Sequence, residues 1–336
     1  QAGGGPNTAR QISFRAGLPV DRPAFTINQA CGSGLQAVLS AARAIRLGEA
    51  EIVLAGGTES MSNTPYLLPR ARWGYRMGNA EIVDGMYQDG FNDPLSKFVM
   101  GETAEELAAE KGIDRDASDR FALESQLRCE RARKSGRFAA EIAPITVAGK
   151  KGDLTVEHDE HPRDGATIDM MTKLAPVFRK GGAVTAGNAS GITDGAAALL
   201  VASRAAAERH GLTIAARLTA WEVVGVEPRI MGIGPVPAVE RLFKRTGLTW
   251  SDIDLVELNE AFAPQVLAVL KGWNWDDRDR LNVNGSGISL GHPIGATGGR
   301  ILANLLRELR RRDGRYGLET MCIGGGQGAA GLFEIV

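Results

Sequence analysis

The chain has 336 residues, with 39 basic and 40 acidic side chains and a formal net charge of −1. This balance gives no overall electrostatic field that would attract nucleic acid or a membrane surface. No apolar run approaches the roughly 18 residues of a membrane span. The start of the chain shows no signal peptide, and three widely separated cysteines favour a reducing compartment over a disulfide framework. We therefore expect a soluble, cytoplasmic protein, long enough for two or three packed units.

The first elements surround Cys31. Residues 9–18 have the pattern of a helix, and Phe25 and Ile27 alternate like a short strand. Apolar residues from Leu35 onward recur at helical spacing. Cys31 is therefore predicted at a strand-to-helix turn, where the free N–H groups of the helix would stabilise a thiolate and lower the thiol pKa. The alternative is a cysteine that only packs, because free cysteine is among the most buried residue types.

The residue composition changes in the next part of the chain. Residues 51–57 have the pattern of a buried parallel strand that ends in glycines. From 61 to 180 the sequence has scattered aromatics, prolines and charges, with helical patterns at 101–111 and 116–134. We interpret this stretch as an inserted, mainly helical subdomain with long loops. Its end, 150–180, carries both signs of charge, as expected of a solvated face or, alternatively, of a site for a phosphate-bearing ligand.

Alternating strands and helices then return. Small residues at 184–191 would let a ligand lie close to the backbone, or would simply form a packed loop. The elements that follow are a strand at 218–226, a helix from Pro235 and a strand at 254–258. The last strand leads directly into Asn259.

An internal repeat is the strongest indication of architecture. Around Cys31 the order is strand, glycine turn, helix, strand and a glycine pair. The same order recurs near the end, with a strand at 281–284, a glycine turn holding His292, a helix at 296–312, a strand at 318–323 and three glycines. Two like halves would place their turns at facing positions, so we expect Cys31 and His292 to meet.

Two side chains near the end stand at glycine-rich turns. His292 is flanked by glycines and a proline, which fix the backbone without adding bulk, and this favours a catalytic imidazole over a structural one. Cys322 precedes three glycines whose backbone N–H groups are free to act as oxyanion donors. Without that turn, Cys322 would be interpreted as a buried strand residue.

Five motifs in this chain resemble those of thiolases, the family of acetyl-CoA acetyltransferases and 3-ketoacyl-CoA thiolases. They are Asn-Gln-Ala-Cys-Gly-Ser-Gly at 28–34, Gly-Asn-Ala-Ser-Gly at 187–191, Asn-Glu-Ala-Phe-Ala at 259–263, Gly-His-Pro-Ile-Gly-Ala-Thr-Gly at 291–298 and Cys-Ile-Gly-Gly-Gly-Gln-Gly at 322–328. The motifs occur in the family's order and span nearly the whole chain. Each is weak alone, and together they are specific.

The resemblance implies an α/β, thiolase-like fold, in which two similar mixed-sheet halves form a layered α-β-α-β-α arrangement. The first half would occupy 1–60 and return at 181–210, and the second would occupy 211–336. The loop subdomain at 61–180 would cover the active site. Thiolases assemble as homodimers or homotetramers, and the resemblance implies the same here.

The implied activity is the condensation of two acetyl-CoA molecules to acetoacetyl-CoA, or the reverse cleavage of a 3-ketoacyl-CoA, without a cofactor or a metal. Cys31 would carry the acyl group as a thioester, and His292 would activate its thiol. Cys322 would move the proton at the carbon that condenses. Asn259 would hold a water at the enolate oxygen, and Gly324 would donate its N–H to the acyl-enzyme oxyanion. Glu260 is expected to orient polar neighbours.

Further positions match the part of thiolases that binds the acyl-CoA substrate. They are Met100, Arg163, Leu174, Ser190 and Phe262. Two departures accompany the match. Val99 stands where short-chain biosynthetic members carry histidine, which puts the acyl-chain preference in doubt. The chain also begins about one strand and one helix later than thiolases do, so we expect a trimmed or partial chain.

Other functions stay open at this point. A ketoacyl synthase of the same superfamily would need a second histidine where Cys322 stands. A cysteine hydrolase would leave Cys322 without a role, and a thiolase relative without turnover would bind acyl-CoA or lipid but form no acyl-enzyme. A disulfide between Cys31 and Cys322 is a further alternative. The segment 66–86 would serve assembly or cover the site.

Overall fold

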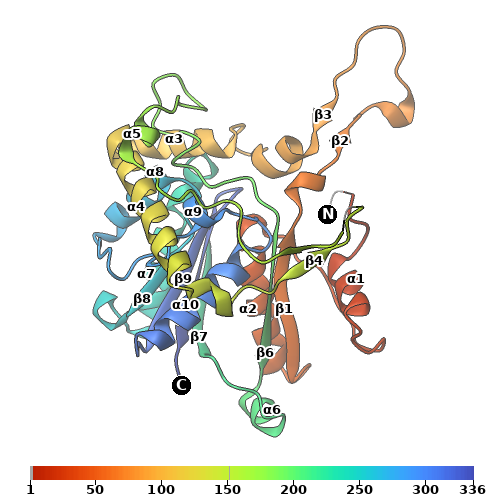
Figure 1. Ribbon diagram of the computed structural model, residues 1–336, viewed down its shortest axis with the longest axis vertical. Helices are drawn as coiled ribbons and strands as arrows, with labels where there is room; N and C mark the ends of the chain where they lie inside the picture. The colour runs from red at the N-terminus through yellow and green to blue at the C-terminus, as the bar shows by residue number, and fades with distance from the viewer. Residues whose placement is uncertain (1–2, 151) are drawn as a thin grey trace.

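Two helices from opposite ends of the chain, α2 (Ser33–Arg46) and α10 (Thr297–Arg311), pack against each other at the centre of the fold (Figure 1). The computed structural model describes residues 3–150 and 152–336. Each helix has apolar residues at every third or fourth position, and these are buried in one shared core. The helices approach closely at glycines, since a Cβ at Gly298 would lie 2.2 Å from the backbone nitrogen of Leu35.

The two central helices lie between two sheets. A four-stranded sheet has the order β7-β10-β9-β8, and a two-stranded sheet pairs β1 with β6. Both sheets contribute side chains to the core around α2 and α10, so the central layers are sheet, helices and sheet. The strands are β1 (Ile52–Glu59), β6 (Gly195–Ala202), β7 (Arg217–Gly225), β8 (Leu255–Leu258), β9 (Tyr316–Ile323) and β10 (Gln327–Glu334).

A second core covers the other face of the four-stranded sheet. It joins α7 (Pro235–Thr246) and α8 (Ala263–Trp273) to the buried side of α4 (Arg115–Lys134). Both α7 and α8 begin with a proline in the first turn, where the missing N–H costs no helical hydrogen bond. The α/β fold class predicted from the sequence is confirmed.

The chain between β1 and β6 includes helices at the top of the view and an arm that projects from the body (Figure 1). Its long helices are α3 (Met100–Lys111) and α4, and the arm holds the antiparallel pair β2 (Tyr66–Leu67) and β3 (Val83–Asp84). The remaining helices and strands are α1 (Thr8–Arg15), β4 (Ile145–Val147), β5 (Leu154–Val156), α5 (Ile168–Thr172), α6 (Arg204–Arg209) and α9 (Gly287–Leu290). Short helical turns are η1 (Ala30–Gly32), η2 (Met61–Asn63), η3 (Ala71–Trp73), η4 (Tyr87–Phe91), η5 (Arg137–Ala140), η6 (Pro228–Ile233) and η7 (Trp250–Asp252).

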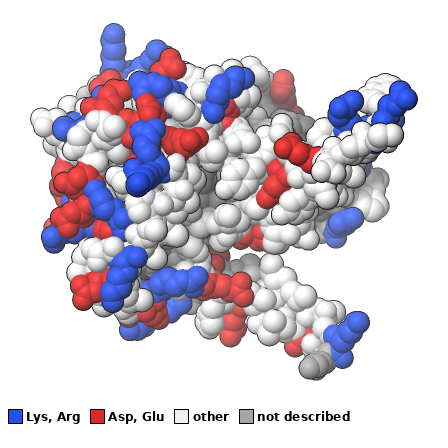
Figure 2. Space-filling view, turned by 90° about the horizontal axis from the view of Figure 1, so that it is seen from above, with Lys and Arg blue, Asp and Glu red and all other residues white. Residues whose placement is uncertain are grey.

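Charged side chains of both signs are interspersed on the face of the molecule seen from above (Figure 2). This distribution accords with the near balance of 39 basic and 40 acidic residues. Among the residues that the structure describes, no helix is both long and apolar enough to cross a membrane.

Helices and strands with clear periodicity form where the sequence predicts them. The helices predicted at 101–111, from Pro235 and at 296–312 are α3, α7 and α10, and the strands at 218–226 and 318–323 are β7 and β9. In both halves a central helix is followed by a strand that pairs antiparallel, β1 with β6 and β9 with β10. The order predicted by the internal repeat is thus present after each glycine turn.

Three strand predictions are wrong. β1 pairs antiparallel with β6 and not in a parallel sheet, and it continues through its glycines to Glu59. The segment around Phe25 forms no strand, and the Phe25 side chain is exposed. At 281–284 there are only isolated bridges, because Asn282 has a φ of 43° and its side-chain amide bonds both backbone groups of Leu258 in place of a strand. Alternating apolar residues form a strand only where a partner strand is available.

Candidate active site

Cys31 lies in η1, a single turn directly before α2. Side chains hold this turn, since the N–H of Gln29 donates to Ser33 Oγ at 2.9 Å and Ser33 Oγ donates to Ala30 O at 2.8 Å. Ala30 has a φ of 44°, a left-handed conformation that is strained for a residue with a side chain. The turn buries the Cys31 side chain and packs against α10 and β9.

The Cys31 thiol is protonated at neutral pH. Burial raises its pKa to about 11, although the backbone N–H groups of Gly324 and of Cys31 itself lower it. The carboxylate of Glu59 adds a further increase. The prediction that this turn gives Cys31 a lowered pKa is therefore wrong, because desolvation outweighs the lowering by the N–H groups. Cys31 needs a neighbouring base to become a nucleophile.

His292 has one ring nitrogen without a proton. Thr297 Oγ1 donates its single proton to Pro293 O at 3.0 Å, so it accepts from Nδ1–H of His292 at 2.5 Å. This hydrogen bond fixes the tautomer and leaves a lone pair on Nε2, which faces Asn259 Nδ2 at 3.4 Å. Burial, with a smaller contribution from Arg300, lowers the pKa of His292 to about 3. The imidazole is therefore neutral at neutral pH, with an unprotonated Nε2.

Cys322 lies beside Cys31 in an apolar environment. It is fully buried on β9, in a cluster that includes Met231 and Phe262. Burial raises its pKa well above the ordinary thiol value, and charge on Cys31 raises it further. The Gly324 N–H that donates toward Cys31 follows directly in the turn after β9. A thiol with a high pKa is a strong base once it has lost its proton.

Asn259 and Glu260 have different environments. Asn259 is fully buried after β8, and its Oδ1 has no hydrogen-bond partner among the described residues. The carboxylate of Glu260 accepts from Ser125 Oγ at 2.6 Å, from Asn282 Nδ2 at 2.9 Å and from the N–H of Ile288 at 3.2 Å. Glu260 thus holds neighbouring segments in place, whereas Asn259 has a free acceptor for a bound molecule.

The residues matched to acyl-CoA binding occupy two regions. Met100 and Phe262 pack in the cluster around Cys322, and the Ser190 N–H donates to Ala261 O at 2.9 Å beside it. Leu174 and Arg163 are exposed and belong to loops outside this cluster. The structure therefore places the inner residues next to the thiols and the outer two nearer to solvent.

Sequence reasoning missed the partners that orient these groups. Thr297, which fixes the tautomer of His292, stands only five positions away within the motif at 291–298. Thr193 accepts from the N–H of His292 at 2.9 Å from 99 residues away, and Ser125 reaches Glu260 from 135 residues away. No local pattern marked the last two, because their partners are distant in the sequence.

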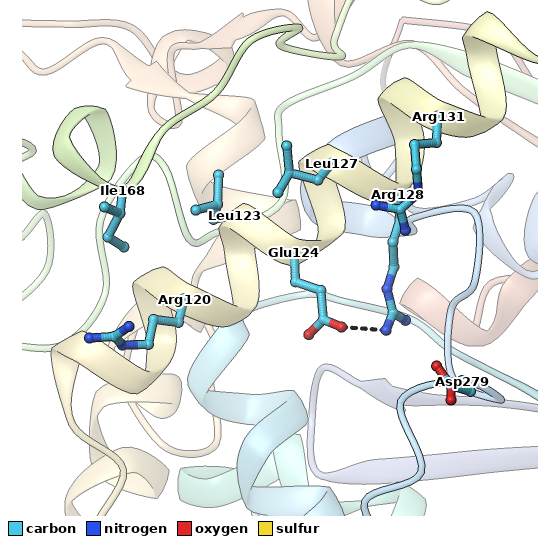
Figure 3. A pocket seen from close by; sticks show the side chains of 8 residues that line it. All are labelled: Arg120, Leu123, Glu124, Leu127, Arg128, Arg131, Ile168 and Asp279. Atoms are coloured by element: carbon cyan, nitrogen blue, oxygen red, sulfur yellow. Dashed lines mark hydrogen bonds and ion pairs between the residues drawn. The ribbon is translucent and has the colours of Figure 1, made fainter.

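A surface groove of about 510 Å³ lies elsewhere, on the outer face of α4 (Figure 3). It contains none of the predicted site residues. The residues that line it are Arg120, Leu123, Glu124, Leu127, Arg128, Arg131, Ile168 and Asp279. Arg128 and Glu124 form an ion pair on this face, so the groove combines apolar side chains with charged ones.

The chain matches one protein family along nearly its whole length. The family description "Thiolase, N-terminal domain" matches residues 1–205, and "Thiolase, C-terminal domain" matches residues 212–335. An acetyl-CoA acetyltransferase of Cupriavidus necator is 52% identical over 330 residues, which cover 98% of this chain and 84% of that protein.

Solved structures agree with this match. An acetyl-CoA acetyltransferase of Bacillus anthracis superposes with a TM-score of 0.97 at 44% identity, covering 100% of this chain and 85% of the other. The human mitochondrial 3-ketoacyl-CoA thiolase in complex with CoA superposes with a TM-score of 0.93 at 46% identity, covering 98% of this chain and 82% of the other.

Proposed function

The chain belongs to the thiolase family and is an acyltransferase, and we propose that it transfers acyl groups between CoA thioesters through a thioester on Cys31. The substrates are CoA thioesters, and the reaction needs no cofactor. The reaction is the condensation of two acetyl-CoA molecules or the thiolytic cleavage of a 3-ketoacyl-CoA. The observation that carries the proposal is the glycine turn after β9, whose Gly324 N–H donates toward the Cys31 thiol beside Cys322.

The acylation step uses His292 as the base. Nε2 of His292 takes the proton of Cys31, and the thiolate attacks the carbonyl carbon of the acyl-CoA. The N–H groups of Cys31 and Gly324 stabilise the oxyanion as it forms. The bond from the acyl carbon to the CoA sulfur then breaks, and Cys322 gives its proton to the departing CoA thiolate. The acyl group is left on Cys31, with a proton on His292 and a thiolate on Cys322.

The second step forms the carbon–carbon bond. The Cys322 thiolate takes a proton from the methyl group of a second acetyl-CoA, and the protonated His292 and a water held by Asn259 stabilise the enolate oxygen. The enolate carbon attacks the acyl carbon, and the bond to Cys31 breaks. His292 returns its proton to Cys31, so both thiols and the imidazole regain their starting states. Cleavage of a 3-ketoacyl-CoA is the same sequence in reverse.

Intact-protein mass after mixing with acetyl-CoA tests this proposal, with cleavage of acetoacetyl-CoA measured on the same samples. We expect an acetyl adduct that Cys31→Ala abolishes and Cys322→Ala retains, with turnover lost in both variants. The matched control is Cys129→Ala, because Cys129 is equally buried but lies in a separate cluster. If the wild-type protein binds acetyl-CoA but forms no adduct, the proposal is wrong, and the chain is instead an acyl-CoA-binding protein without turnover.

Assembly and location belong to the same proposal. The arm at 64–86 projects from the body of the protein (Figure 1). It exposes large apolar side chains, among them Tyr66, Trp73, Met77 and Ile82. Large exposed apolar groups of this kind are typical of contact surfaces between proteins. We propose that the arm joins copies of this chain in a homodimer or homotetramer that works in the cytoplasm.

A further inference from the structure

The start of α4 holds a buried ion pair that reaches two loops. Arg115 is the first residue of this helix, and its Nε donates to Asp119 Oδ2 at 2.7 Å. The Asp119 side chain is completely buried, whereas that of Arg115 is 25% exposed. A carboxylate at this depth requires a paired charge and further hydrogen bonds to offset its desolvation. The same hydrogen bonds connect α4 to the loops.

Arg115 holds the segment 171–174. Its Nη2 donates to Met171 O at 2.8 Å and to Leu174 O at 2.9 Å. A guanidinium can donate hydrogen bonds to a carboxylate and two carbonyls at once, because its N–H groups point in several fixed directions. The side chains of this segment lie against Gly187, where an added Cβ would be 2.5 Å from Leu174 Cδ1 and 2.9 Å from Met171 Sδ.

Asp119 holds the loop 183–190 with its other oxygen. Asp119 Oδ1 accepts from Asn188 Nδ2 at 2.8 Å. The same amide donates to Ala183 O at 2.9 Å and accepts from the N–H of Thr185 at 2.8 Å. The Asn188 side chain therefore closes the turn of this loop, and the buried Asp119 carboxylate orients that side chain.

From these contacts we propose that Arg115 and Asp119 are positioning residues that fix the spacing between the two segments and so the width of the acyl-CoA channel. The inference rests on the proposed function, in which each segment carries one channel residue, Leu174 or Ser190. The reacting groups stand on other elements, η1, β9 and the turn before α10. Loss of the ion pair should therefore weaken substrate binding and leave the chemical steps unchanged.

The first variant is Arg115→Lys, which keeps a positive charge for Asp119 but cannot reach both carbonyls. We expect KM for acetoacetyl-CoA and the calorimetric Kd for CoA to rise about tenfold, with kcat changed by less than about twofold. The matched control is Arg120→Lys. Arg120 forms an ion pair on the same helix with Asp116, but both side chains are mostly exposed and Arg120 lies on the outer face of α4 (Figure 3).

A double variant, Arg115→Met with Asp119→Asn, removes both charges together and leaves no unpaired ion in the interior. We expect the same rise in KM and Kd, with a melting temperature that shows a folded protein. Unchanged KM and Kd in both variants, or a fall in kcat at constant KM, would overturn the positioning role. If the wild-type protein forms no acyl-Cys31 but binds CoA, the proposed function fails while the Kd comparison still decides this inference. No CoA binding by the wild type overturns both.

Discussion

Protonation at Cys31 and His292 sets how the site can react. Burial keeps the thiol protonated and the imidazole neutral, with pKa values of about 11 and about 3. In the proposed acylation step, the thiol therefore starts protonated and the imidazole starts neutral. Thr297 orients the imidazole, because its hydrogen bond to Nδ1–H leaves the lone pair on Nε2.

The raised thiol pKa predicts the pH dependence of Cys31 alkylation. Without substrate, the rate with iodoacetamide should increase about tenfold for each pH unit from 7 to 10, because the thiolate fraction grows until the pH reaches about 11. Peptide mapping by mass spectrometry separates Cys31 from the other two cysteines. A rate that levels off below pH 8 would contradict the protonated thiol.

At the scale of elements, the parallel pair β8 and β9 carries two acids that no function here uses. Glu257 and Glu319 are direct partners in the register, and both are buried. Both oxygens of Glu319 and one of Glu257 have no hydrogen-bond partner among the described residues. Burial raises the pKa of both carboxyls, and the charge of Glu257 raises that of Glu319 further. Burial therefore favours the protonated form of both carboxyls.

This pair predicts a loss of stability as pH rises. Unfolded glutamates ionise above a pH of about 4.3, whereas the folded pair keeps its protons, so folding is disfavoured increasingly up to the folded pKa. Glu319→Gln cannot ionise, and its melting temperature should exceed that of the wild type by a growing margin from pH 5 to pH 8.

Thermal melts at several pH values measure this margin. The control is Glu240→Gln, because Glu240 is exposed on α7 and should leave the melting temperature unchanged. A margin for Glu319→Gln that is constant or shrinks with pH would show that the carboxyl ionises in the folded protein.

At the scale of the whole molecule, the crossing of α2 and α10 joins the two halves. Cys31 lies in η1, the turn before α2, and His292 lies in the turn before α10. The contact between these helices therefore sets the relation between the nucleophile and its proposed base. The backbones approach so closely that only glycine fits at Gly298, next to the backbone of Leu35.

Gly298→Ala should separate the halves. Its Cβ would lie 2.2 Å from the Leu35 nitrogen, and backbone cannot move aside without shifting a helix. We expect kcat to fall about 100-fold, because displacements of about 1 Å at reacting groups have effects of that size. The melting temperature should fall as well. Turnover and thermal melts are compared with Gly90→Ala, where an added Cβ has open space, and wild-type values for Gly298→Ala would refute the coupling.

The sequence by itself determined the family, the glycine turns and the strongly periodic elements. Cys31, His292 and Cys322 could be selected because each stands at a glycine-rich turn, and α3, α7 and α10 because apolar spacing is a local property. Such features depend on neighbours within a few residues. These turns and elements can therefore be predicted from the sequence without knowing what packs against them.

Only the tertiary structure decided the rest. The direction of β1, the absence of a strand at 281–284, the raised pKa of Cys31 and the reach of Arg115 all depend on partners far along the chain. Strand pairing needs a second strand, and desolvation needs a surrounding core. A helix N-terminus in the sequence suggests a low thiol pKa, but burial by distant segments reverses the sign. The local sequence identifies the candidate site residues, whereas long-range packing determines the environment of their side chains.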